Sequence, residues 1–282
     1  MRIFYIITIA IFSMSLRPCF ASDDDKELTV SMHKLEPFVF VKNGNVDSGF
    51  VVDIFNAMAK KVGYRGEVQH TTFVRGIRNL EMSSSSRPKA KPVNVSPYHA
   101  HLIVVRTKMR NPKFKWVGPL MYDGTVLYQR ADDPREFKSL DELKRNNVLC
   151  TVKRKVSDSE TFTDLGLSFY ETDSQEQAIL MLVNSPKRVD CTPIAVMNTK
   201  EILEQINVKS SQLKPMIFQL PAHPVYMAFS LSTPESIISK WRNALHELDK
   251  SGQRLKMIQK YVPAYTTSLE SKLKSSIKYI FK

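Results

Sequence analysis

The chain has 282 residues, 43% of them hydrophobic, and a formal net charge of +13. This length suits one large or two modest domains, each with a real core. So many cations would suit nucleic-acid binding, but aromatic residues are not regularly interleaved with them, and the N-terminus indicates export. We therefore expect no nucleic-acid partner and expect the charge to attract anionic solutes.

Residues 1–21 have the pattern of a secretory signal, with a short basic start, an apolar stretch and a small residue at Ala21. We expect cleavage near Ala21, which removes two cations and no acid and leaves a net charge of +11. Retention as an N-terminal anchor is the alternative. A lipoprotein anchored at Cys19 is disfavoured because Arg17 and Pro18 are bulky where small residues are expected. No later segment has the pattern of a membrane span.

Strand-like and helix-like patterns alternate along the first part of the mature chain. Apolar and polar residues alternate at 28–33, whereas the apolar positions of 50–62 recur at helical spacing and stop before Gly63. A stretch rich in serine, proline and cations at 83–92 predicts a mobile surface loop. The other segments predicted before residue 106 are a strand at 66–70, a helix at 74–82 and a strand ending at Val105.

The alternation continues to the C-terminus. Ser139 is expected to cap one helix and Thr233 another, with Pro234 at its first position. The tail at 266–282 is basic and is expected to be a frayed helix. Such alternation predicts mostly parallel sheets covered on both faces, an α/β fold. The predicted strands are 124–130, 148–152, 167–170, 189–194, 215–219 and 225–231, and the predicted helices begin near Ser139, Ser157, Ser174, Thr199, Thr233 and Gln253.

Two cysteines, Cys150 and Cys191, remain in the exported chain, and both lie in short apolar segments that predict buried strands. Buried free thiols are the expectation, since cysteine is among the most buried residue types. A disulfide between neighbouring strands is the alternative in an oxidising compartment.

The segment 106–120 places five cations within ten positions, directly after the apolar run that ends at Val105. A buried strand that delivers a guanidinium to its end is suited to hold an anion. A solvated charged face and a phosphate-binding patch are the alternatives.

The order of these elements resembles the family 3 periplasmic solute-binding proteins, which include the amino-acid receptors of ABC importers. The resemblance implies the type II periplasmic-binding-protein fold, with two α/β lobes, each a mostly parallel sheet flanked by helices, and two hinge crossings that let the lobes close on a ligand. It runs from about Glu27 to Pro263 and rests on Glu36–Phe40, Gly49–Asp53, Arg106–Leu120, Ser139–Leu143 and the helix that follows Thr233 and contains Trp241.

The resemblance also divides the chain. It implies that residues 22–125 and 226–265 form lobe 1, and that residues 130–222 form lobe 2. The crossings are expected at 128–133 and 221–226. The implied protein is a periplasmic monomer with no cofactor.

In the first lobe, the resemblance implies that Arg110 binds the ligand's carboxylate. Thr107 is the first residue of the same Thr-x-x-Arg motif. Arginine suits this task because its planar fork can meet both oxygens of a carboxylate. Phe73 falls where an aromatic residue faces the cleft, although packing in the core would explain it equally well. Arg75, two residues after Phe73, resembles the arginine of a Trp-x-Arg motif found in a sub-group of these proteins.

In the second lobe, Lys153 and Ser157 bound the strand-to-helix turn that faces the ligand in relatives. Backbone N–H groups at a helix start favour an anion there, and a solvated turn is the alternative. The acids that usually bind the ligand's ammonium group are missing, because Ala195 stands at one position and Met32 near the other. Glu36 is the one substitute that the sequence suggests. An unpaired buried ammonium is costly, so we expect an anionic or polar ligand that need not be an amino acid.

Three classes of function follow from the resemblance. The first is a binding protein that serves an ABC permease. The second is a receptor for a membrane signalling partner. The third is a dehydratase-like enzyme of the same fold, for which Glu36 is the acid that the sequence offers. No catalytic triad, metal cluster or phosphate loop stands out, so we expect a binding protein and not an enzyme.

Overall fold

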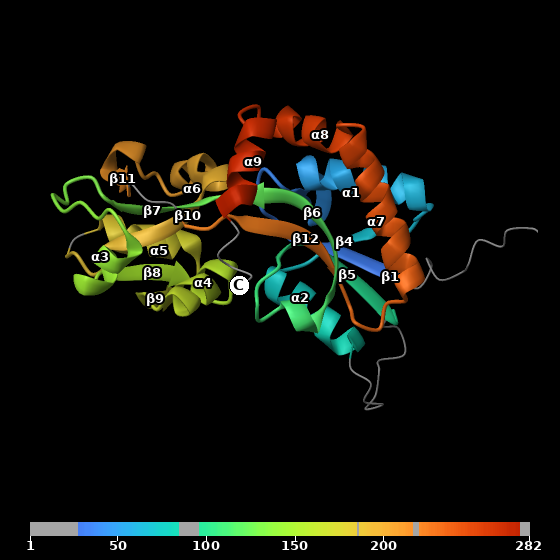
Figure 1. Ribbon diagram of the computed structural model, residues 1–282, viewed down its shortest axis with the longest axis horizontal. Coiled ribbons are helices and arrows are strands. Elements are labelled where there is room, and N and C mark those ends of the chain that lie inside the picture. Colours follow the sequence, from blue (N-terminus) through green and yellow to red (C-terminus); the bar gives the residue numbers. More distant parts are fainter. Residues whose placement is uncertain (1–27, 85–95, 185, 217–219, 277–282) are drawn as a thin grey trace, which may run out of the picture.

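Two five-stranded sheets form the frame of the molecule in the computed structural model, which describes residues 28–84, 96–184, 186–216 and 220–276 (Figure 1). The predicted signal segment lies outside the described residues, as does most of the predicted loop at 83–92. Within the described part of the chain, no helix is long and apolar enough to cross a membrane.

The first sheet has the strand order β4-β1-β5-β12-β6. Four of its five strands run in one direction, because β1 is parallel to β4 and β5, while β12 is antiparallel to both β5 and β6. The bounds are β1 Leu28–Met32, β4 Val68–His70, β5 Tyr98–Val105, β6 Lys115–Asp123 and β12 His223–Phe229; a separate hairpin joins β2 Phe40–Lys42 to β3 Asn45–Ser48.

The second sheet repeats this arrangement in the order β11-β7-β10-β8-β9. Here β8 is parallel to β9 and β10, and β7 is the single reversed strand. The predicted fold of mainly parallel sheets is therefore confirmed. The bounds are β7 Thr125–Arg130, β8 Leu149–Lys153, β9 Ser168–Thr172, β10 Cys191–Ala195 and β11 Leu213–Pro215.

Helices cover both sheets, and we call each sheet with its helices a lobe. In the first lobe, α2 lies on the opposite side of the sheet from α1 and α8 (Figure 1). The first lobe's helices are α1 Phe50–Val62, α2 Phe73–Ser84, α7 Glu235–Lys250, α8 Gln253–Tyr261 and α9 Thr267–Ser276, and the second lobe's are α3 Leu140–Arg145, α4 Ser157–Leu165, α5 Gln175–Val183 and α6 Thr199–Gln205.

The first core packs aromatic side chains of α1 against those of α7. The ring of Phe55 stacks on Trp241 with centroids 5.4 Å apart, and both side chains are almost fully buried. Gly63 ends α1 in the left-handed conformation, as predicted. Thr233 does not cap α7 through its side chain, because its hydroxyl bonds to Ser230 instead.

The chain changes sheets at Gly124, between the end of β6 and the start of β7. The predicted crossing at 128–133 is therefore placed too late, since Tyr128 already pairs with both neighbours of β7 in the second sheet. The return path lies between β11 and β12, and His223 already belongs to the first sheet. Only the first two residues of the predicted return crossing, 221–226, lie between the sheets.

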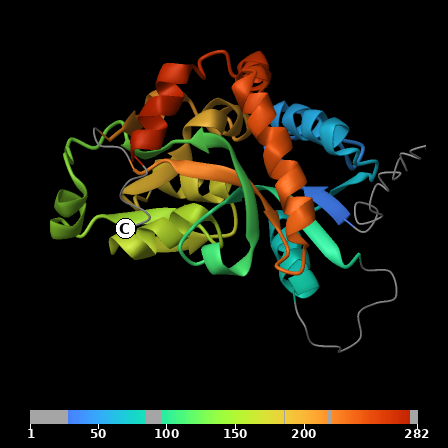
Figure 2. The ribbon, with the colours of Figure 1, turned by 45° about the vertical axis from the view of Figure 1, so that its right-hand side comes forward.

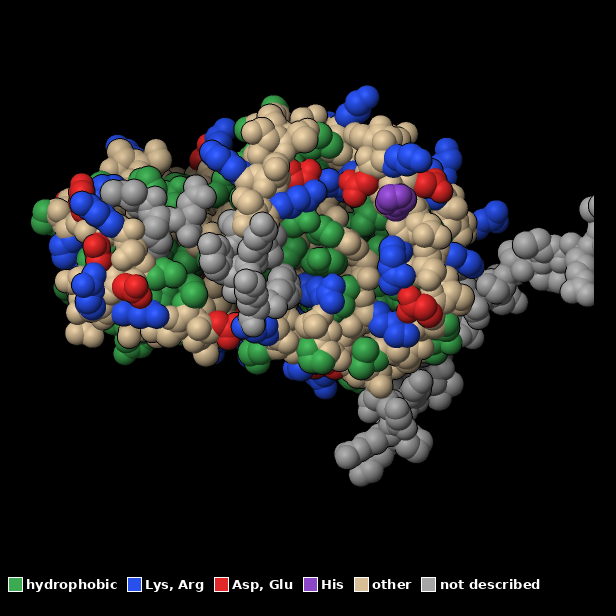
Figure 3. Space-filling view, viewed as in Figure 1, with side chains coloured by type: hydrophobic (Ala, Val, Ile, Leu, Met, Phe, Trp, Pro, Cys, Tyr) green, Lys and Arg blue, Asp and Glu red, His purple; other side chains and the backbone are tan. Residues whose placement is uncertain are grey.

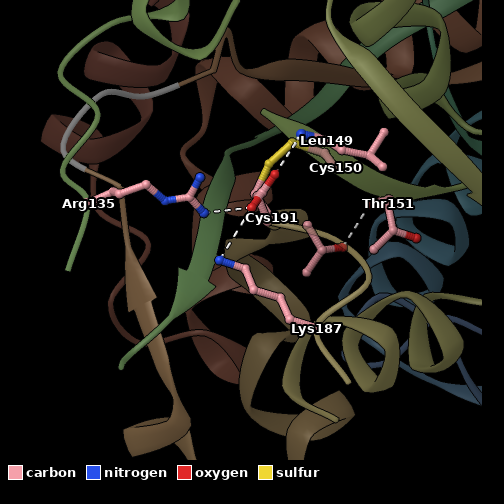
Figure 4. Close-up of a disulfide and its surroundings, with 8 residues drawn as sticks. Arg135, Leu149, Cys150, Thr151, Lys187 and Cys191 are labelled. Carbon is pink, nitrogen blue, oxygen red and sulfur yellow. Dashed lines mark hydrogen bonds and ion pairs between the residues drawn. A yellow bond between two sulfur atoms is a disulfide. The ribbon is translucent and has the colours of Figure 1, made fainter. Parts of the chain in front are cut away.

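Cys150 and Cys191 form a disulfide (Figure 4), which corrects the expectation of free thiols. The two residues are register partners on the parallel strands β8 and β10, with Cα atoms 4.4 Å apart. Charged side chains lie at one end of the bridge, where Arg135 donates to Asp190 at 2.6 Å. Asp133 accepts from the same guanidinium, and this hydrogen bond holds its pKa well below the usual value.

The described part of the C-terminal segment, α9 over Thr267–Ser276, is an anchored helix rather than a frayed one, and the rest of the predicted tail lies outside the described residues. Glu270 on α9 is buried and accepts from Arg254 at 2.8 Å, while Arg254 also donates to the carbonyl of Leu120 at 2.8 Å. Figures 1 and 2 place α9 above the strands that lead from one sheet to the other. The side chain of Leu273 reaches the crossing, since a Cβ atom at Gly124 would lie 3.2 Å from it.

Replacing Glu270 with glutamine should lower the free energy of unfolding by about 2 kcal/mol, because the buried guanidinium of Arg254 loses a charged hydrogen-bond partner. Arg254 still donates to Asp249 and to the carbonyl of Leu120 in this variant. Chemical denaturation measures this loss. Glu235→Gln is the control, because the Glu235–Arg242 pair is exposed and should contribute less than about 0.5 kcal/mol. Equal losses in the two variants would contradict the anchoring role.

Candidate functional site

A cavity of about 320 Å³ lies between the two lobes, next to the crossing. Both lobes supply its wall, so relative motion of the lobes would open or close it. The first lobe contributes residues at the ends of β1, β5 and β6 and at the start of α2, and the second contributes the turn between β8 and α4. On the outer surface shown in Figure 3, lysine and arginine side chains are spread over both lobes among acidic ones.

Four of the predicted site residues line this cavity, namely Phe73, Arg110, Lys153 and Ser157. Thr107 is buried behind Arg110, and its hydroxyl accepts from the Arg110 backbone N–H at 3.3 Å. It therefore positions the arginine without lining the cavity.

Arg75 and Glu36 lie outside the cavity. Arg75 is in the first turn of α2 and is exposed. The buried residues of this helix are Gly76, Leu80 and Ser83. Glu36 pairs with Lys34 at 3.1 Å and lines a separate hollow together with acidic residues of α5 and α6.

The Arg110 guanidinium is the central cation of the site, and the residue is 8% exposed. Its Nη2 lies 2.7 Å from Oε1 of Glu160 on α4, and it also donates to the carbonyl of Lys155 at 3.4 Å. The guanidinium carbon lies 5.3 Å from the centroid of the Phe73 ring. Burial lowers the pKa of Arg110, and the charge of Glu160 opposes that shift. Arg110 therefore joins the lobes through a carboxylate that belongs to the chain itself.

Sequence reasoning missed Glu160. Its signal was present, since acidic residues at Asp158 and Glu160 follow the predicted helix start at Ser157. Their distance in sequence from Arg110 concealed the contact.

The second-lobe wall is basic. Lys153 ends β8, and Lys155 has a φ of 60°, in the left-handed region. Ser157 begins α4. The N-cap residue of this helix is Val156, so no side-chain hydrogen bond caps its first backbone N–H groups. Arg154 pairs with the exposed Asp173 at 3.1 Å, whereas the ammonium groups of Lys153 and Lys155, which also line the cavity, form no hydrogen bond or ion pair with any residue that the structure describes. This wall supports the predicted preference for an anion.

Acidic and histidine side chains from the crossing form the third part of the wall. His223 Nε2 lies 3.0 Å from Oδ1 of Asp158, and Thr125 donates to the same oxygen at 3.3 Å. Asp123 is 9% exposed, and its Oδ1 has no hydrogen-bond partner within the described ranges. Burial raises the pKa of Asp123 to about 7, with His223 opposing and Asp158 adding to the shift. The sequence signalled none of this, because Asp123 precedes a glycine as many surface turns do.

A row of polar side chains extends from the cavity into the first lobe. His33 lines the cavity, and its Nδ1 lies 3.1 Å from Nε2 of His101. His101 Nδ1 lies 2.8 Å from Ser31 Oγ, which lies 3.0 Å from Nε2 of His99. Gly76 packs against the His101 ring so closely that any side chain at 76 would collide with it. His99 and His101 lie on one face of β5, and both contact the hydroxyl of Ser31.

Groups that could hold a metal ion are absent from the described residues: no three histidine, cysteine or acidic side chains converge there. The site offers instead fixed cations, one acid of raised pKa and two histidines, His33 and His223, which are groups that bind and orient a small polar molecule.

No protein-family model and no curated protein matches this chain. Solved structures do match its fold. The arginine-, lysine-, histidine-binding protein ArtJ from Geobacillus stearothermophilus is 16% identical with a TM-score of 0.63, over 87% of this chain and 99% of that one. A histidine kinase sensor domain with similarity to periplasmic binding proteins is 15% identical with a TM-score of 0.66, over 83% of this chain and 95% of that one.

A third match is an ancestral amino-acid-binding protein described as a precursor of cyclohexadienyl dehydratase. It is 18% identical with a TM-score of 0.60, over 85% of this chain and 96% of that one. The structural neighbours of this chain are thus amino-acid-binding proteins and a sensor domain, in agreement with the resemblance seen in the sequence. The chain has the two-lobed α/β fold of the type II periplasmic binding proteins.

Proposed function

We propose that this protein captures a small carboxylate-bearing or otherwise anionic ligand in the cavity between its lobes, and that the lobes close around the ligand. The observation that carries the proposal is the position of Arg110, a buried guanidinium in a cavity wall that Lys153 and the start of α4 also form. A guanidinium in a dry cleft can make two charge-assisted hydrogen bonds to one carboxylate. The ligand is held without chemical change.

We further propose that the protein acts in the periplasm and delivers its ligand to an ABC permease. A receptor role for a membrane signalling partner is the second candidate, and the similarity to a histidine kinase sensor domain favours it. In both roles the closed form of the protein binds a membrane partner, and the two roles differ in which membrane protein that is.

Native mass spectrometry of the protein purified from its own periplasm tests the proposed binding, because a ligand held in a closed cavity should remain bound. Calorimetry then compares simple carboxylates with ordinary L-amino acids. Tight binding of L-amino acids, with no binding of simple carboxylates, would contradict the proposal for an anionic ligand.

Glu160→Gln should strengthen the binding of an anionic ligand about tenfold, because the ligand would compete with a neutral amide for Arg110 rather than with a carboxylate. Isothermal titration with a carboxylate that binds the unmodified protein measures the change. Glu171→Gln is the control, since Glu171 forms part of a neighbouring hollow without an ion pair to Arg110. Weaker binding in Glu160→Gln would show that Glu160 supports the site rather than competing for it.

Affinity for an anionic ligand should fall by up to about tenfold between pH 6 and pH 8, because the cavity gains a negative charge as Asp123 ionises around its pKa of about 7. An acid whose pKa is raised is neutral below that value, so binding is strongest at the lower pH. His223, Asp158 and Tyr265 are the other titratable groups that act on Asp123.

Binding of the same ligand by Asp123→Asn should be nearly independent of pH over this range. His223→Gln is the matched control, because His223 lines the same cavity and acts on Asp123. A dependence that persists in Asp123→Asn and disappears in His223→Gln would assign the effect to His223.

A further inference from the structure

The hydrogen bonds that connect His33, His101, Ser31 and His99 have a defined direction from donor to acceptor. Each neutral imidazole carries one N–H, so a ring that donates through one nitrogen accepts through the other. Burial keeps the rings neutral, since it lowers the pKa of His33 to about 3 and that of His99 to about 4. It also lowers the pKa of His101 well below the usual value.

Ser31 sets that direction. Its hydroxyl has one hydrogen, and the carbonyl of Ala100 lies 3.4 Å away as an acceptor. With this hydrogen directed to the carbonyl, Ser31 Oγ accepts from both histidines that contact it, at 2.8 and 3.0 Å. His101 therefore carries its hydrogen on Nδ1.

The state of His33 follows from that of His101. With its hydrogen on Nδ1, His101 has an unprotonated Nε2, which lies 3.1 Å from His33 Nδ1. His33 must donate across this contact, so its own hydrogen is on Nδ1 and its Nε2 is unprotonated. No hydrogen bond to that nitrogen comes from any residue that the structure describes, although His33 lines the cavity.

We propose that His33 Nε2 is a hydrogen-bond acceptor for the ligand and that it selects anionic ligands bearing a hydroxyl group, such as hydroxycarboxylic acids. A hydroxyl is favoured over an ammonium group because the positive charge of Lys153 acts on His33 and would repel a second cation. The neighbouring Phe73 ring meets His33 edge-on, with centroids 5.3 Å apart, and fixes the plane of the imidazole. This selection rests on the proposed function, since it requires a carboxylate-bearing ligand in the same cavity.

The proposed positions of the hydrogens on His33 and His101 can be tested in the unmodified protein without a ligand. Long-range proton–nitrogen NMR spectra of histidine-labelled protein distinguish protonated from unprotonated ring nitrogens, and loss of one set of signals in His33→Gln assigns His33. We expect hydrogen on Nδ1 of both His33 and His101. Hydrogen on Nε2 of His33 would overturn the inference and leave the proposed function untouched.

Selection is tested by calorimetry with matched pairs, D- and L-malate against succinate and D- and L-lactate against propionate. We expect a hydroxy acid to bind about tenfold more tightly than its partner, a preference that His33→Phe loses and His246→Gln, at an exposed histidine, keeps. His33→Gln, whose amide oxygen can reach the position of Nε2, should recover part of it. Equal affinities within every pair overturn the selection alone, whereas no binding of any of these acids overturns both the selection and the proposed capture of simple carboxylates.

Discussion

Arg110→Ala should weaken the binding of a carboxylate ligand at least about a hundredfold, because two charge-assisted hydrogen bonds of about 1.5 to 3 kcal/mol each are lost from a buried site. Isothermal titration with a carboxylate that binds the unmodified protein measures the loss. The fold should survive, since the guanidinium lies in the wall of a cavity and outside the apolar cores.

Two further variants separate the possible reasons for this loss. Arg110→Ala leaves Glu160 without its partner, and that charge would repel an anion by itself. The double variant Arg110→Ala, Glu160→Gln removes the repulsion and should still bind at least tenfold more weakly than Glu160→Gln alone. Recovery of full affinity in the double variant would show that Arg110 only neutralises Glu160. Arg106→Ala is the control, because Arg106 stacks on Trp116 and Tyr226 away from the cavity lining.

Replacing both Cys150 and Cys191 with alanine should lower the free energy of unfolding by about 4 kcal/mol. The reason is that the bridge closes a loop with a sequence separation of 41 and so restricts the unfolded chain. Urea denaturation followed by circular dichroism measures the change, and the loss should be confined to the second lobe if the lobes unfold separately.

Reduction supplies the control for this variant. Dithiothreitol should destabilise the unmodified protein by a similar amount and leave the double-alanine variant unchanged. Equal stability of the oxidised protein and the variant would contradict a stabilising role for the bridge.

Local signals in the sequence predicted most elements of the fold. Ser139 and Ser174 accept from backbone N–H groups at the starts of their helices, and Gly63 ends α1, so turn and cap chemistry located these boundaries well. Pairing between strands was less accessible. The cysteines were placed on strands, but the strand order that puts β10 beside β8 depends on contacts far apart in sequence.

The same distinction holds for the cavity. Arg110, Lys153 and Ser157 were predicted because the resemblance to the solute-binding proteins assigns ligand contacts to these positions, and ligand sites of parallel sheets lie near the carboxyl ends of the strands. Asp123 and His33 were missed because their importance comes from their surroundings. One oxygen of Asp123 is buried with no hydrogen-bond partner among the described residues, and the His33 imidazole lies at the end of a buried row. Burial of this kind is set by the whole fold and leaves no local pattern.

The register of β6 with β12 has an architectural consequence. Asp123 and His223 face each other across the two strands, at the points where the chain leaves the first sheet and comes back to it. The second lobe is therefore inserted into a β-hairpin of the first, with the whole of residues 124–222 in place of its turn. Because both connections start from adjacent positions, a change of twist in this one hairpin would reorient the inserted lobe as a unit.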